Sequence, residues 1–182
     1  ISAGAVAGHA SLMDCRALTL DPRPVPASVV VVVLDTGTRR VLADVAYGER
    51  RAACQRAAAA LGVPALRDAT PEVLAAIADP IDRRRAGHVV SENERTLAAA
   101  AALDQGDGAR FGALMSESHR SLRDDYEVSG PGLDCIVEVA SSGPGCLGAR
   151  MTGGGFAGCA VALVDAAAVA PFLRNVSAGY RC

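Results

Sequence analysis

The sequence feature that most constrains the fold is a run of three glycines, Gly153, Gly154 and Gly155, near the C-terminal end of the chain. The residues on either side, 148–152 and 159–164, have the composition of short strands. Three consecutive glycines leave a backbone free to take positive φ between two such strands. The pattern therefore predicts a β-hairpin with a glycine-rich tip.

This tip admits two interpretations. Gly153, Gly155 and Gly158 formally match the dinucleotide pattern G-x-G-x-x-G, but that pattern requires a helix to begin inside it, and here a β-branched strand follows. The absence of Lys from the chain excludes a P-loop. The tip could still bring several N–H groups to an anion such as phosphate. A hairpin turn without a ligand is the alternative, and the residues alone leave both open.

The N-terminal part of the chain is expected to contain two strands. His9–Leu18 has strand character and is followed by the breaker-rich segment Asp21–Pro26, which predicts a turn. Val29–Leu34 is a nearly continuous β-branched run, which is typical of a strand buried on both faces.

Helices account for most of the remaining pattern. Thr70-Pro71-Glu72 predicts the cap of one short helix, and Gly106-Asp107 predicts a tight break between two longer antiparallel ones. The expected helices cover residues 49–61, 73–78, 83–103, 111–122, 131–140 and 166–177. Hairpins and tight turns among these elements favour an α+β fold, a largely antiparallel sheet with helices packed on one face.

Charge and cysteine spacing argue against several classes of partner. The chain has 20 acidic and 18 basic residues, and the basic ones are spread out, so a nucleic-acid partner is not expected. The longest apolar run, Val29–Leu34, is too short to cross a bilayer, and we expect no membrane partner and a cytoplasmic location. The six cysteines lack zinc-site spacing, and no metal ligand is predicted.

His119 lies near Glu117, Asp124 and Asp125, which invites a metal or acid–base interpretation. Helical phase argues against it, because His119 and Asp124 are five residues apart. We interpret the group as a salt-bridge cluster at a helix end.

Several segments together resemble the galactokinases, sugar kinases of the GHMP superfamily. The glycine-rich stretch Met151–Val164 resembles the third conserved motif of that superfamily in its galactokinase form. Other matching segments occur in the same order, at residues 12–18, 47–54, 65–68, 88–96 and 116–128. The resemblance implies a GHMP kinase C-terminal domain with a ferredoxin-like sheet at residues 28–182. Residues 1–27 would be the end of the N-terminal domain or a connection.

The resemblance also implies an activity for the full-length protein. Galactokinases transfer the γ-phosphoryl group of ATP to galactose with the help of Mg²⁺. The family's catalytic aspartate, its ATP loop and its sugar-binding cluster would lie upstream of Ile1, in the N-terminal half of the same polypeptide. No catalytic residue is therefore expected in this chain, and the fragment alone should be inactive.

Five residues of the chain match substrate-proximal positions of the family. Tyr47 would hydrogen-bond a sugar hydroxyl, Arg39 would lie on the nucleotide side of the cleft, and Gly153–Gly155 would lie near the phosphates. Two departures from the family pattern are the loop Asp35-Thr-Gly-Thr38 and Ala157, where a fourth glycine is usual.

Two other functions are compatible with the same residues. A galactokinase-like sensor or regulator would bind sugar and ATP without turnover. A free-standing α+β module would use the glycine hairpin for a small anion. The upstream sequence distinguishes both from an enzyme.

Overall fold

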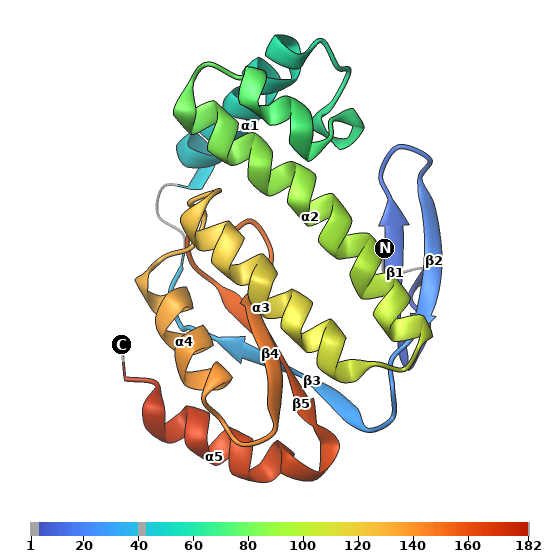
Figure 1. Ribbon diagram of the computed structural model, residues 1–182. Coiled ribbons are helices and arrows are strands. Elements are labelled where there is room, and N and C mark those ends of the chain that lie inside the picture. Colours follow the sequence, from blue (N-terminus) through green and yellow to red (C-terminus); the bar gives the residue numbers. More distant parts are fainter. Residues whose placement is uncertain (1–3, 40–42, 182) are drawn as a thin grey trace.

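The computed structural model describes residues 4–39 and 43–181, which form two antiparallel sheets and a set of helices (Figure 1). Strands β1 (His9–Asp14) and β2 (Thr19–Pro24) pair with each other. Strands β3 (Val29–Asp35), β4 (Cys146–Met151) and β5 (Cys159–Asp165) form a second sheet in the order β3-β5-β4. The predicted α+β class and the glycine-tipped hairpin β4–β5 are both confirmed.

The helices begin and end close to the expected positions. They are α1 (Ala43–Leu61), α2 (Pro80–Asp104), α3 (Gly108–Asp124), α4 (Pro131–Ser141) and α5 (Val169–Gly179), with 3-10 turns at Leu66–Asp68, Pro71–Ala76 and Ala166–Ala168. Asp79 caps α2 by accepting the N–H groups of Ile81 and Asp82. Gly106 has a φ of 69° and ends α2, and Asp107 caps α3, so the predicted antiparallel pair is confirmed.

Helices α4 and α5 cover one face of the three-stranded sheet. Ala160, Ala162 and Val164 of β5 point to this face and pack with Val137 and Phe172 in a fully buried core. Alternate residues of a strand point to opposite faces, so Gly148 of β4, which neighbours core residue Ala149, faces the other way.

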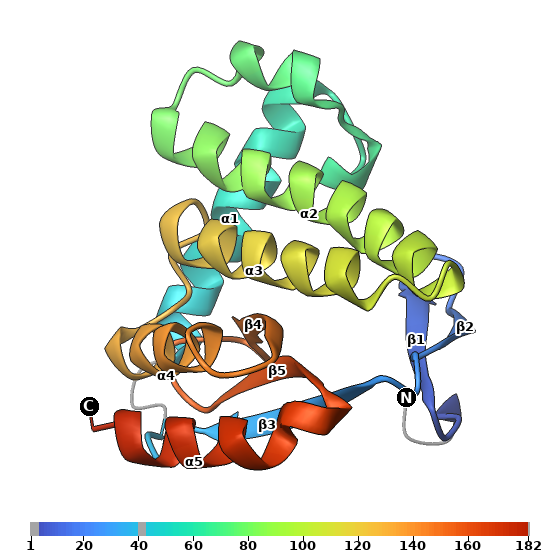
Figure 2. The same ribbon diagram turned by 60° about the horizontal axis from the view of Figure 1, so that its bottom comes forward.

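Helix α3 lies on this second face, against the edge formed by β4 (Figure 2). The contact is close because glycines meet there: a Cβ on Gly148 would lie 1.8 Å from the Gly112 carbonyl oxygen. Helix α2 packs on α3, and α1 packs on α2 around a separate core that includes Ala57, Ile77 and Ala86. Within the described ranges, no helix combines the length and the apolar composition needed to cross a membrane.

The β1–β2 hairpin is attached to the helical layer by exposed ion pairs. Arg23 pairs with Asp104 at the end of α2 at 2.8 Å, and Arg16 pairs with Asp68 at 2.7 Å. Such exposed pairs contribute little stability, about 0–1 kcal/mol each. They fix the direction of the hairpin more than they hold the fold together.

Three predictions about the strands are wrong. The Pro-rich segment Asp21–Pro26 is largely strand β2, and the expected strand His9–Leu18 ends at Asp14, with its last four residues forming the turn. Proline is tolerated in β2 because a two-stranded hairpin leaves an open edge where no N–H is needed. The run Val29–Leu34 is not buried on both faces, since Val31 and Val33 are 49% and 67% exposed on an edge strand.

The expected helix at residues 73–78 is also different in kind. It is a 3-10 segment, Pro71–Ala76, that ends two residues earlier than predicted. Pro80 does not simply follow it but occupies the first turn of α2, where a missing N–H costs nothing.

Candidate functional site

The tip of the β4–β5 hairpin is built from left-handed backbone. A hydrogen bond from Thr152 N to Cys159 O, 3.0 Å long, closes the hairpin below the tip. Gly153 and Gly155 have φ values of 77° and 79°, which side-chain-bearing residues adopt only at a cost. Gly153 and Gly154 are exposed, whereas Gly155 is buried. The tip thus has an open side and an anchored side.

The anchored side rests on the segment that connects α3 to α4. A Cβ on Gly155 would lie 2.0 Å from the Val128 carbonyl oxygen, so only glycine fits there. The next residue, Phe156, donates its N–H to the same oxygen at 2.7 Å and has a φ of 65°. The hairpin is therefore held by Val128 in a defined conformation.

Arg39 follows β3, whose end is also attached to the hairpin. Thr36 donates its N–H and its hydroxyl to the Gly158 carbonyl oxygen at 3.0 and 2.7 Å. Arg39 lies three residues further on and is exposed. The segment that leads to Arg39 therefore begins next to the base of the glycine hairpin.

Tyr47 lies on α1 and is 61% exposed. Arg50 follows one turn later, and its guanidinium lies 5.8 Å from the centre of the Phe156 ring, within cation–π range. The segments that carry Tyr47, Arg39 and Gly153–Gly155 therefore meet around the glycine hairpin.

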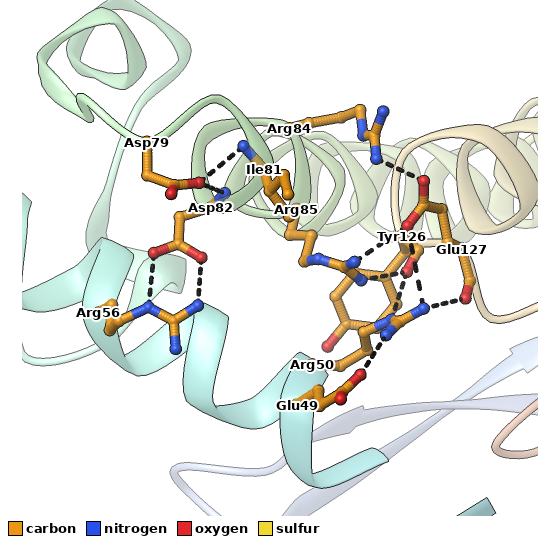
Figure 3. A network of polar contacts seen from close by, with 10 residues as sticks. All are labelled: Glu49, Arg50, Arg56, Asp79, Ile81, Asp82, Arg84, Arg85, Tyr126 and Glu127. Atoms are coloured by element: carbon orange, nitrogen blue, oxygen red, sulfur yellow. Dashed lines mark hydrogen bonds and ion pairs between the residues drawn. The ribbon is translucent and has the colours of Figure 1, made fainter. Parts of the chain in front are cut away.

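An arginine network that the sequence analysis missed supports this corner of the molecule (Figure 3). Arg50 and Arg85 both donate to the Tyr126 carbonyl oxygen, at 3.0 and 2.9 Å. Arg84 and Arg85 also pair with the carboxylate of Glu127. The only sequence signal was the basic run at residues 83–85, which says nothing about its distant partners.

A second charged group lines a cavity of about 550 Å³ on the other side of the sheet from α4 and α5. Glu92 accepts hydrogen bonds from Arg95, Arg150 and Ser118. Burial raises the pKa of Glu92, but the Ser118 and Arg95 hydrogen bonds and the nearby arginine charges outweigh it and leave the pKa below its usual value. Arg150 is thereby fixed at the start of the glycine motif.

The interpretation of His119 as part of a salt-bridge cluster with Glu117, Asp124 and Asp125 is wrong, because its contacts are with Met151 and Asp134. The side chain is buried between α3 and α4, where Nδ1 accepts the Met151 N–H at 3.3 Å and Nε2 lies 3.6 Å from Asp134. Burial lowers the pKa of His119, which favours a neutral ring. Across residues 4–39 and 43–181, no group of three or more His, Cys, Asp or Glu side chains could hold a metal ion.

His88 is also buried, and it stacks on the ring of Tyr126 at a centroid distance of 4.6 Å. Its Nδ1 lies 2.9 Å from the Ser121 hydroxyl. Burial lowers the pKa of His88 from 6.5 to about 4. The neutral His88 ring therefore packs against Tyr126, the residue that precedes Glu127.

This shift predicts a pH dependence of stability. The unfolded chain takes up a proton at His88 near pH 6.5 and the folded chain only near pH 4, so stability falls as pH drops through that window, by about 3 kcal/mol at most. His88→Phe keeps the stacking ring and removes the titration. Denaturant unfolding of the full-length protein at pH 7.5 and 4.5 should show a smaller loss for this variant. An unchanged loss would contradict the assignment, and the exposed His9→Gln serves as control.

The chain is similar to known proteins both in sequence and in structure. The family model "GHMP kinases C terminal" matches residues 99–182. Over 96% of the chain, the sequence is 50% identical to a galactokinase of Roseiflexus sp. (strain RS-1), and over 95% it is 48% identical to a galactokinase of Homo sapiens. The chain is thus similar to galactokinases over nearly its whole length, and residues 99–182 match the C-terminal domain model of the GHMP kinases.

Solved structures support the same placement. The structure of Lactococcus lactis galactokinase complexed with galactose matches 95% of the chain with a TM-score of 0.89 and 37% identity, and the match covers 47% of that chain. The structure of L. major mevalonate kinase in complex with R-mevalonate shows a likeness of fold alone: it is 23% identical, with a TM-score of 0.57, over 89% of this chain and 42% of its own. The chain spans about half the length of the galactokinases it matches, 46% of the Roseiflexus protein and 45% of the human one.

Proposed function

We propose that the full-length protein phosphorylates galactose with ATP, and that this chain supplies one wall of the cleft between the two substrates. The observation that carries the proposal is the convergence of three segments around the glycine hairpin in a chain related to galactokinases along nearly its whole length. In the same proposal, residues 28–182 form the C-terminal domain, residues 1–27 belong to the N-terminal domain or a connection, and the protein is cytoplasmic.

Each matched residue has a role that its position allows. The exposed Tyr47 hydroxyl is available to hydrogen-bond a sugar hydroxyl. The exposed glycines Gly153 and Gly154 present a backbone that phosphate oxygens can approach without meeting a Cβ. Arg39, which is exposed and lies three residues after the hairpin contact of Thr36, would offset phosphate charge.

ATP-dependent transfer implies Mg²⁺, which would neutralise phosphate charge. Following the family resemblance, we place the Mg²⁺ ligands in the N-terminal half of the polypeptide and none among the described residues. Catalytic proton transfer is likewise assigned to the N-terminal half of the polypeptide.

The deciding experiment is ADP release by the full-length protein with and without galactose. Galactose-dependent release supports the enzyme, whereas binding of galactose and ATP without ADP release supports the alternative of a sensor. The isolated chain should show no turnover in the same assay. Turnover by the isolated chain would overturn the placement of the catalytic groups upstream.

Tyr47→Phe tests the sugar contact in the full-length protein. Loss of one hydrogen bond should raise the KM for galactose about tenfold and leave the KM for ATP unchanged. Tyr180→Phe is the matched control, because the Tyr180 hydroxyl already donates to the Thr36 carbonyl oxygen at 3.0 Å inside the fold. Unchanged galactose kinetics in Tyr47→Phe would remove Tyr47 from the site.

A further inference from the structure

Strained backbone is concentrated where the glycine hairpin meets the α3–α4 connection. Among the described residues, three non-glycine residues have positive φ: Leu18, Glu127 and Phe156. Leu18 lies in an exposed turn. The other two belong to one contact, because Phe156 donates its N–H to the carbonyl oxygen of Val128, and Glu127 directly precedes Val128. A non-glycine residue in the left-handed backbone conformation costs about 1–3 kcal/mol of folding free energy, and it persists only where the surrounding structure holds it.

Arg50 contacts both of the strained residues. Its Nη2 donates to the Glu127 carbonyl oxygen at 2.6 Å, and its Nε donates to the Tyr126 carbonyl oxygen at 3.0 Å. The same guanidinium lies over the Phe156 ring. The planar guanidinium of arginine can donate to two carbonyl oxygens while its face lies over an aromatic ring, and the compact ammonium group of lysine does not offer this geometry.

The environment of Arg50 shows that its role is not an ordinary surface ion pair. Its side chain is 11% exposed, and burial, together with the charge of Arg85, lowers the pKa of the guanidinium. Its nearest carboxylate oxygens, on Glu49 and Glu127, lie at 3.3 and 3.9 Å, farther than both carbonyls. A largely shielded cation directed at backbone carbonyls fixes backbone geometry.

We propose that Arg50 is a positioning residue that holds the glycine hairpin in its strained conformation, in a fixed relation to Tyr47 one helical turn away. The inference rests on the proposed function, because the hairpin is taken to face the phosphates of ATP. Arg50 would thereby tie the sugar side of the cleft to its nucleotide side.

Two variants of the full-length protein test the role of Arg50. Arg50→Gln removes the fork and the charge, and Arg50→Lys keeps only the charge. Hydrogen exchange in peptides covering residues 152–158 should become about tenfold faster in both. The KM for ATP should rise about tenfold, while the KM for galactose changes less than about twofold.

Arg56→Gln is the matched control on the same helix. Arg56 makes an equally bidentate pair with the Asp82 carboxylate, at 2.7 and 2.6 Å, and lies away from Glu127 in Figure 3. Exchange at residues 152–158 should stay at the wild-type rate in this variant. Phe156→Leu removes the ring from the opposite side and should give part of the Arg50→Gln effect even where Arg50→Gln folds poorly.

The outcomes separate this inference from the proposed function. Unchanged exchange at residues 152–158 in Arg50→Gln and Phe156→Leu overturns the role of Arg50. So does an equal rise in both KM values, which would indicate general damage to α1. Absence of galactose-dependent turnover in the wild-type protein overturns the proposed function, and the exchange measurements then still decide whether Arg50 holds the hairpin.

Discussion

Gly148→Ala is expected to destabilise the full-length protein by about 3 kcal/mol, which lowers the melting temperature of a protein about twice as long as this chain by about 4 °C. The added Cβ would lie 1.8 Å from the carbonyl oxygen and 2.4 Å from the carbonyl carbon of Gly112. Both atoms are backbone, so no side-chain rotation relieves the clash. Helix α3 would have to separate from β4, and the contact between the sheet and the helical layer would loosen.

Gly87→Ala is the control for this variant. Gly87 lies inside α2, and the nearest atom to its added Cβ is the Leu74 Cδ1 at 3.9 Å, an ordinary contact. Because alanine is the better helix former by about 0.5–1 kcal/mol, the melting temperature should stay the same or rise slightly. A melting temperature for Gly148→Ala within about 2 °C of wild type would show that the close approach of α3 is not required.

Gly155→Ala is expected to reduce the kcat/KM of the full-length protein about 100-fold, the effect of a displacement of about 1 Å near reacting groups. The backbone φ of 79° disfavours alanine, and the new Cβ would lie 2.0 Å from the Val128 carbonyl oxygen. The hairpin would be pushed away from the segment that anchors it. Steady-state kinetics with ATP and galactose measure the loss.

Gly158→Ala separates the effect of positive φ from the effect of the clash with the Val128 carbonyl oxygen. Its φ of 99° is equally unfavourable, but nothing lies within 4 Å of the added Cβ. This variant should therefore carry the conformational cost of about 1–2 kcal/mol in stability and retain most of the activity. Equal loss of activity in both variants would mean that positive φ, and not the contact with Val128, governs the hairpin.

The candidate site could be predicted from the sequence only as far as family resemblance reached. Tyr47, Arg39 and Gly153–Gly155 were expected on that ground, and their roles in the full-length protein stay predictions. Arg50 and Glu127 could not have been paired, because they are 77 positions apart and neither lies in a pattern that implies the other. His119 was interpreted as part of a salt-bridge cluster at a helix end because helical phase cannot tell which face another helix will cover.

The sequence by itself determined the local elements of this protein: the hairpin at the glycine run, the break at Gly106-Asp107 and the helices with clear boundaries. These follow from backbone preferences that act within a few residues. Only the tertiary structure decided that Val33 lies on an open edge, that prolines can occupy β2, and that Gly148 meets Gly112. The physical reason is that edges, close approaches and buried ion pairs depend on partners distant in the chain, which local preferences do not encode.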